Sequence, residues 1–164
     1  MDSNTLLKLS QVKPLLRYTL RHGCVVLIGI FTLTVTVPAL AGAPAERTVW
    51  DQVYTEAQAA RGARIFTQHC ALCHAENMQG GFGGAAALVG PEFQFLWNDK
   101  SVGALFTILR AKMPPGQAGS LSDQEYADLV AVILQRNGFP AGEDGELPGD
   151  GSLTSDIRIT WEKP

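Results

Sequence analysis

Two segments in the middle of the chain space their apolar residues as amphipathic helices do. The first runs from Thr55 to Gln68, and the second from Ser101 to about Ala111. Apolar or small residues recur every three or four positions: Ala59, Gly62, Ile65 and Phe66 in the first, and Leu105, Phe106, Ile108 and Leu109 in the second. Gly62 lowers helix propensity but lets another helix approach closely. We therefore expect two helices, the first crossed by a neighbour at Gly62.

A third segment is the clearest helix, because both of its ends are marked. Ser122-Asp123-Gln124-Glu125 has the spacing of a capping box, in which the serine and glutamate side chains bind backbone N–H groups of the first turn. The helix ends at Asn137-Gly138, with Pro140 beyond it. Its apolar stripe consists of Tyr126, Leu129, Val130 and Ile133. Thr55-Glu56-Ala57-Gln58 has the same capping-box spacing at the start of the first helix.

The remaining segments do not have a helical pattern. Residues 80–87 are too rich in glycine for regular structure and predict a loop. Residues 139–164 begin as an acidic stretch with glycine and proline, and Ile157-Arg158-Ile159-Thr160-Trp161 then alternates like a short strand. This tail either packs on its own domain or offers an edge or an acidic patch to a partner. The pattern as a whole predicts an all-α, loop-rich fold with an extended C-terminal tail.

The first 41 residues differ in kind from the rest. Four basic side chains and one acidic one precede an apolar run from Cys24 to Val37: Lys8, Lys13, Arg17, Arg21 and Asp2. This run is shorter than the roughly 20 residues that span a bilayer, and Pro38 breaks it. Ala39-Leu40-Ala41 then offers the small residues of a peptidase site. We predict a signal peptide cleaved after Ala41 and a periplasmic protein; an uncleaved N-terminal membrane anchor is the alternative.

Composition and charge narrow the class of protein. The 164 residues are 46% hydrophobic and 18% charged, which suits one folded domain and not a disordered chain. Without residues 1–41, nine basic and 15 acidic side chains remain, a formal net charge of −6. Nucleic acid and membrane surfaces are therefore poor partners, and a basic patch on another protein is a good one. We expect an N-terminal extension at 42–54, a domain at 55–138 and the acidic tail at 139–164.

The two cysteines that remain after signal removal carry the chemistry. They stand in Cys70-Ala71-Leu72-Cys73-His74, the C-x-x-C-H signature of covalent haem c attachment. Thiols three residues apart on one helical turn can both add to the vinyl groups of one haem, and His74 is then carried under the iron. A zinc site, a thioredoxin-like redox pair and a structural disulfide are the alternatives. One covalent haem c, with His74 as the proximal iron ligand, explains the motif best.

A second axial ligand has to come from the other histidines and methionines of the mature chain. His69 adjoins Cys70 and cannot reach the opposite face of the ring, and Met78 follows His74 too closely. Met113 follows the second predicted helix, and Pro114 favours an extended conformation for it. The alternative is that Met113 only fills a gap in the core. We predict Met113 as the distal iron ligand.

Residues about 50–140 resemble the class I monohaem cytochromes c. The likeness rests on Gly62 and Phe66 before the C-x-x-C-H motif, the glycine-rich loop, Met113-Pro114 and the last helix. A finer likeness, to cytochromes that accompany periplasmic PQQ-dependent dehydrogenases, rests on further stretches: Trp50-Asp51, Tyr54-Thr55, Gln58, Gly90 to Trp97, Gly119 to Ser122, and Asn137 to Gly142. The resemblance implies a small all-α fold, with N- and C-terminal helices crossing around a covalent haem, and one-electron transfer.

Two positions depart from the pattern of that family. Ala86-Ala87-Leu88 stands where the family has Pro-x-Leu, so the carbonyl group that orients the proximal histidine is expected to be an alanine's. Val132 stands where an aromatic residue often lies, so Tyr126 or a methylene contact is expected to fill the crossing with Gly62. Trp97 and Arg110 are candidates for holding the haem propionates, with packing and surface positions as the alternatives.

Iron bound on both sides by protein has no vacant position for oxygen or a substrate. We therefore expect no enzyme but a soluble periplasmic electron carrier, which takes electrons from a dehydrogenase and passes them to a terminal oxidase or another cytochrome. The donor that the resemblance suggests is a PQQ-dependent dehydrogenase. The alternatives are a fixed cytochrome subunit of a dehydrogenase complex, and a ligand-binding or catalytic haem protein in which Met113 does not hold the iron.

Overall fold

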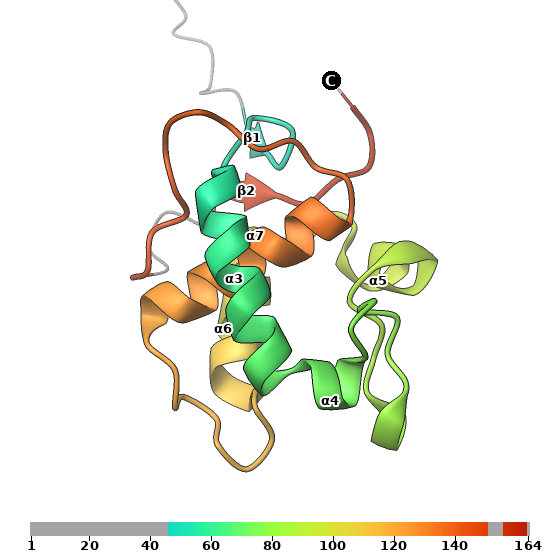
Figure 1. The fold of residues 1–164 in the computed structure, drawn as a ribbon. Helices are drawn as coiled ribbons and strands as arrows, with labels where there is room; N and C mark the ends of the chain where they lie inside the picture. Colours follow the sequence, from blue (N-terminus) through green and yellow to red (C-terminus); the bar gives the residue numbers. More distant parts are fainter. Residues whose placement is uncertain (1–45, 151–155, 164) are drawn as a thin grey trace, which may run out of the picture. The chain divides into compact units, whose positions relative to one another are not determined.

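The computed structural model describes residues 46–150 and 156–163 (Figure 1). The predicted signal peptide at 1–41 lies outside these residues. Within them, no helix combines the length and the apolar character that crossing a bilayer requires. The proposed division into an N-terminal extension, a domain and a tail stays a prediction.

The described chain is mostly helical, with one pair of short strands (Figure 1). Its elements follow in the order β1 (Arg47–Thr48), α3 (Glu56–His69), α4 (Ala71–His74), the 3-10 turn η1 (Phe82–Gly84), α5 (Gly90–Trp97), α6 (Val102–Lys112), α7 (Asp123–Arg136) and β2 (Ile157–Arg158). The expected all-α fold class is confirmed. All three helices that the hydrophobic pattern predicted, α3, α6 and α7, are present within two residues of the expected ends.

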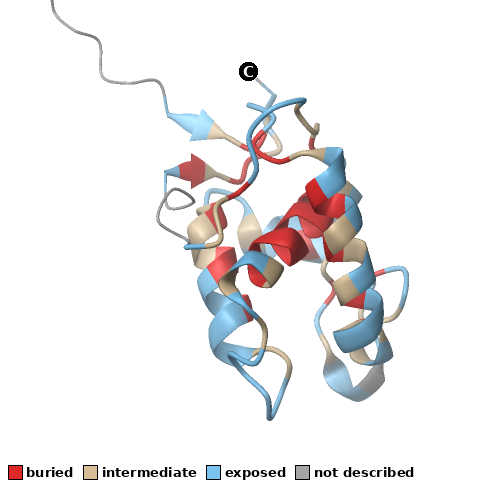
Figure 2. Cartoon of the chain, turned by 60° about the vertical axis from the view of Figure 1, so that its left-hand side comes forward, coloured by how far each residue is buried: buried red, intermediate tan, exposed pale blue. Residues whose placement is uncertain are grey.

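Helices α3 and α7 cross at Gly62, and the middle of α7 is buried (Figure 2). A Cβ atom at Gly62 would lie 1.9 Å from the carbonyl oxygen of Asp128, so the two backbones touch. The expectation that Tyr126 or a methylene group fills this crossing was therefore wrong. No side chain is needed where the backbone of α7 lies directly on the glycine.

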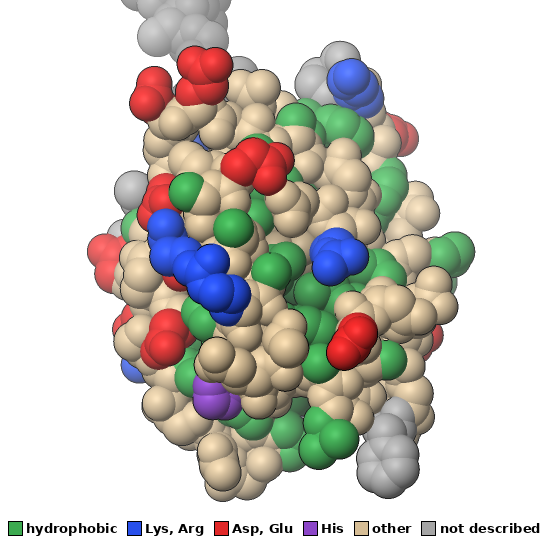
Figure 3. Space-filling view, viewed as in Figure 1, with side chains coloured by type: hydrophobic (Ala, Val, Ile, Leu, Met, Phe, Trp, Pro, Cys, Tyr) green, Lys and Arg blue, Asp and Glu red, His purple; other side chains and the backbone are tan. Residues whose placement is uncertain are grey.

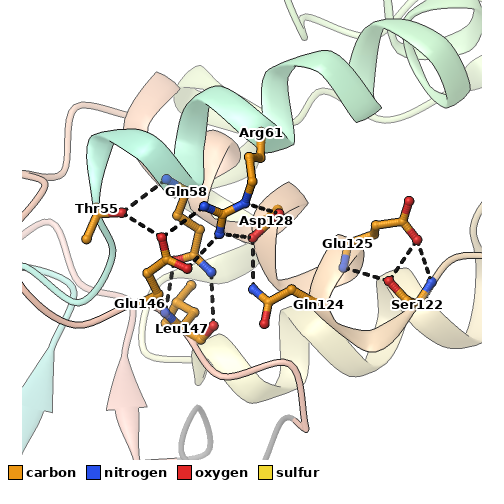
Figure 4. Close-up of polar contacts among 9 residues, drawn as sticks. All are labelled: Thr55, Gln58, Arg61, Ser122, Gln124, Glu125, Asp128, Glu146 and Leu147. Carbon is orange, nitrogen blue, oxygen red and sulfur yellow. Dashed lines mark hydrogen bonds and ion pairs between the residues drawn. The ribbon is translucent and has the colours of Figure 1, made fainter.

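The two predicted capping boxes form to different extents (Figure 4). At the start of α7 the box is complete: the Ser122 hydroxyl accepts from Glu125 N, and the Glu125 carboxylate accepts from Ser122 N at 2.7 Å. At the start of α3, Thr55 accepts from Gln58 N at 3.0 Å, but the Gln58 side chain does not return to Thr55. Its amide instead pairs with the backbone of Leu147, donating to the carbonyl oxygen and accepting from the N–H group, both at 2.9 Å.

Helix α5 was not predicted from the hydrophobic pattern. It has eight residues, and Phe93 is buried while Phe95 and Leu96 are exposed, so no long apolar stripe marks it. Asn137, at the end of α7, accepts a hydrogen bond from Gly90 N at 3.2 Å. The start of α5 is thus held by a residue 47 positions further along the chain.

The C-terminal tail packs on its own domain, as the first of the two interpretations predicted. Leu147, Ile157 and Ile159 are buried. Strand β2 pairs in parallel with β1, with Arg47 opposite Ile157, and the Trp50 indole donates to Thr160 O at 3.0 Å. The expected strand is thus present but covers only two residues, Ile157–Arg158.

Candidate functional site

A cavity of about 600 Å³ brings together the four side chains that the sequence singled out. Cys70, Cys73, His74 and Met113 all line it, although Met113 is about 40 residues from the others in the sequence. The rest of its wall is mainly apolar. Loop residues 83–88 form one part of it, and α3, α5, α6 and α7 supply large apolar side chains: Phe66, Leu96, Trp97, Leu105, Ile108, Leu109, Leu129 and Ile133. An apolar cavity with sulfur and imidazole groups at its wall suits a large flat cofactor that binds metal.

Cys70 is the N-cap residue of the short helix α4, and Cys73 lies within it, so both belong to one turn, as the motif predicted. The N–H groups of Cys73 and His74 both bond to Cys70 O, at 3.1 and 3.0 Å, and this turn brings the three side chains to the cavity. Both cysteines are free thiols, and Leu72 between them is 88% exposed. Burial, and secondly the neighbouring Cys73, raise the pKa of Cys70 to about 11, so this thiol is neutral at neutral pH.

His74 is buried, and its ring is oriented by one hydrogen bond. Nδ1 lies 2.8 Å from the carbonyl oxygen of Ala86. A carbonyl oxygen only accepts, so Nδ1 carries the proton and Nε2 keeps its lone pair for a metal. The expectation that an alanine supplies the orienting carbonyl group is confirmed.

The loop that supplies this carbonyl group is hydrogen-bonded to the C-x-x-C-H turn and to the residues that follow it. Gly80 N donates to His74 O at 3.1 Å, and Leu88 N donates to Met78 O at 2.8 Å. Gly80 has a φ of +76°, and a Cβ atom there would lie 2.5 Å from Ala85 O. Glycine is therefore required where the chain turns towards Ala86.

Met113 ends α6 with an extended backbone, at φ −121° and ψ 145°. This conformation is the one that Pro114 predicted. The N–H group of Met113 caps α6 by donating to Leu109 O at 2.9 Å. The half-buried side chain lines the cavity, within a wall that also contains Pro114 and Pro115.

Tyr126 belongs to the site, although the sequence placed it in the helix crossing. It is fully buried, lines the cavity, donates its hydroxyl proton to Met113 O at 2.7 Å and accepts from Gly119 N at 3.0 Å. A hydroxyl group in the apolar stripe of a helix was the available signal, since buried tyrosines take a hydrogen-bond partner. The position of Tyr126 in the apolar stripe of the helix did not indicate which backbone groups its hydroxyl would bond.

The other candidates lie in different surroundings. Trp97 lines the cavity and stacks on Phe93, while Arg110 is absent from its lining and pairs with Asp123 at 2.6 Å. His69 is exposed at the rim, and Met78 is buried in the core outside the lining. On the face shown in Figure 3, acidic and basic side chains are both scattered, and neither sign covers it.

The donor groups at the cavity differ from those of a zinc site or a disulfide. Within residues 46–150 and 156–163, no group of three or more His, Cys, Asp and Glu side chains is placed to hold a metal ion. The two thiols are not joined to each other. Two free thiols, one imidazole with an open Nε2 and one thioether, around an apolar cavity, do fit haem c.

Residues 57–133 match the family model described as "Cytochrome C oxidase, cbb3-type, subunit III". This segment is therefore similar to cytochrome c domains. It contains the C-x-x-C-H turn, the glycine-rich loop, Met113 and Tyr126. A cytochrome c domain implies haem c and haem-based electron transfer.

Two more distant similarities extend beyond residues 57–133. The chain is 28% identical over 107 residues to a protein named thiosulfate dehydrogenase from Psychrobacter arcticus, covering 59% of this chain and 32% of that one. The matched part thus spans about a third of the relative's length. A crystal structure of the sulfane dehydrogenase SoxCD from Paracoccus pantotrophus shares 21% identity with a TM-score of 0.46, covering 71% of this chain and 64% of that chain. At that distance the second likeness supports no conclusion about function.

Proposed function

We propose that this protein is a periplasmic one-electron carrier with a single haem c. Cys70 and Cys73 would hold the haem covalently, and His74 and Met113 would bind its iron. The observation that carries the proposal is that these four side chains line one apolar cavity. When bound, the haem supplies one-electron oxidation and reduction of its iron.

The residues of the chain would do three things at this site. The Ala86 carbonyl group orients His74 and keeps its Nε2 free for the iron. The apolar wall excludes water, which keeps the site's charge interactions strong. With His74 and Met113 both holding the iron, the chain would leave no open coordination site for oxygen or a substrate. Such a site moves electrons and performs no further chemistry.

Electrons would pass where the cavity reaches the surface. Leu96 and Ile108 both line the cavity and are each 42% exposed, so they mark its edge. Redox partners that dock briefly need only a small interface of this kind. The partners we propose are a dehydrogenase as electron donor, with a PQQ-dependent enzyme as one candidate, and a terminal oxidase or another cytochrome as acceptor.

The test uses absorption spectra of the purified holoprotein and its Met113→Ala variant. The oxidised wild-type protein should show the weak long-wavelength band of methionine bound to ferric haem, and the variant should lack it. Carbon monoxide added to the reduced proteins should bind only the variant. Ready binding of carbon monoxide to the wild-type protein would contradict the proposal and favour a ligand-binding or catalytic haem.

A second candidate is a fixed cytochrome subunit of a dehydrogenase complex. The similarity to part of a longer protein named thiosulfate dehydrogenase supports it, because there a related segment belongs to a chain about three times as long as the match. Size-exclusion chromatography of the protein at its native level, from a gently prepared periplasmic extract, separates the two. Elution as a free small protein supports the carrier, and elution with a large partner supports the subunit.

A further inference from the structure

We infer that Tyr126 is a positioning residue for the Met113 ligand. Its hydroxyl group fixes the backbone from which the thioether extends into the cavity. This inference rests on the proposed function, since it takes Met113 to be an iron ligand. It concerns how firmly the chain holds that ligand, and not which residue the ligand is.

Both polar backbone groups of Met113 are held, and they are held by different elements. Its N–H group donates to Leu109 O of α6 at 2.9 Å. Its carbonyl oxygen accepts from the Tyr126 hydroxyl of α7 at 2.7 Å. With the peptide groups on both sides fixed, the direction in which the side chain leaves the backbone is restricted as well.

The same hydroxyl group also holds the far end of the segment that follows Met113. It accepts a hydrogen bond from Gly119 N at 3.0 Å, six residues further along the chain. Residues 115–120, from the second residue after Met113 to just past Gly119, are all exposed. Two turn contacts lie along it: Gln117 N donates to Pro114 O at 2.9 Å, and Ser120 N donates to Gln117 O at 3.1 Å. The buried Tyr126 hydroxyl therefore connects both ends of this exposed segment to helix α7.

Tyr126 is itself held firmly enough to act as a reference point. It lies in the second turn of α7, whose start is set by the complete capping box of Ser122 and Glu125. Its ring is fully buried and meets Phe106 edge-on, at 6.4 Å between centroids and 81° between planes. Removing only the hydroxyl group would keep this packing and would leave Met113 O and Gly119 N without their partner.

The experiment measures how easily an added ligand displaces Met113 in the ferric holoprotein. Imidazole is titrated into the wild-type protein, Tyr126→Phe and a control, Tyr54→Phe, and the loss of the long-wavelength methionine band is followed. We expect apparent imidazole affinity to rise about two- to tenfold in Tyr126→Phe, the range that one lost hydrogen bond predicts. The isosteric change leaves the ring packing intact.

Tyr54 is a matched control because it makes the same kind of bond elsewhere. It is also fully buried, and its hydroxyl donates to the backbone carbonyl of Phe139 at 2.6 Å, but it is not part of the cavity lining. Tyr54→Phe should lower stability while leaving imidazole affinity within twofold of wild type. An equal rise in both variants, or no rise in Tyr126→Phe, overturns the inference while the wild-type band still supports Met113 as ligand. A wild-type protein without that band overturns the proposed function as well.

Discussion

Gly62 lies against α7 so closely that a larger residue does not fit. The position of a Cβ atom there would be 1.9 Å from Asp128 O and 2.5 Å from its carbonyl carbon. Both atoms belong to the backbone of a helix whose middle is buried, so neither can move alone. The role of this residue is to let two helices touch, and the cavity wall that α7 supplies depends on that contact.

At this scale we predict that Gly62→Ala destabilises the fold. The added methyl group must push α3 and α7 apart against backbone atoms, which should cost about 3 kcal/mol or more and so outweigh the gain in helix propensity of about 1 kcal/mol. Urea denaturation measures the loss. Ala60→Ser, at an exposed position of the same helix, is the control and should stay within about 0.5 kcal/mol of wild type. A Gly62→Ala protein as stable as wild type would show that the crossing is looser than described.

Among the elements, the tail is the one that joins distant parts of the domain. Gln58 holds Leu147, and Arg61 forms ion pairs with both Asp128 of α7 and Glu146 of the tail, at 2.8 and 2.6 Å (Figure 4). Farther on, Trp161 contacts Phe93 of α5, at 6.2 Å between centroids. Since Phe93 stacks on Trp97 of the cavity wall, the tail supports that wall from behind.

We predict that a chain ending at Pro148 melts at a clearly lower temperature. It loses β2 and the buried Ile157 and Ile159, each of which contributes about 1.5–3 kcal/mol by burial. A chain ending at Trp161 is the matched control, because Glu162 and Lys163 are exposed, and its melting temperature should be unchanged. Thermal unfolding followed by circular dichroism provides the comparison. Normal melting of the shorter chain with lost electron transfer would assign the tail to partner docking instead.

At the scale of the whole molecule, three groups with shifted pKa values make the free energy of unfolding depend on pH: Glu146, Glu125 and Tyr54. Hydrogen bonds from Arg61 lower the pKa of Glu146, and those from Ser122 lower the pKa of Glu125. Burial, and secondly the charge of Glu56, raise the pKa of Tyr54 to about 12. The two carboxylates therefore favour folding when charged, and the tyrosine favours it when neutral.

We predict a stability plateau that falls at both extremes of pH. On the acid side, the glutamate contributions are present above the ordinary pKa near 4.3 and are lost as pH falls below it. On the alkaline side, Tyr54 stabilises the fold below pH about 10, and this is lost as pH rises towards 12. Denaturation midpoints across the pH range give the curve. Glu146→Gln should flatten the acid limb and Tyr54→Phe the alkaline one; unchanged slopes would assign the limbs to other groups.

The amino-acid sequence by itself determined the features that depend on neighbours along the chain. The C-x-x-C-H turn, the serine cap of α7 and the extended Met113 before Pro114 all follow from residues within a few positions. Local backbone geometry decides these, so a one-dimensional pattern contains them.

Only the tertiary structure decided which distant groups meet. The sequence predicted a local helix cap at Gln58, but its side chain bonds to Leu147, 89 residues away. It predicted a helix-crossing role for Tyr126, but the Tyr126 hydroxyl bonds to Met113 and Gly119. Helix α5 depends in the same way on Asn137 at its start. A buried polar group must find a partner, but its own position in a helix does not specify which one. That choice is made when the helices pack and bring particular backbone groups within reach.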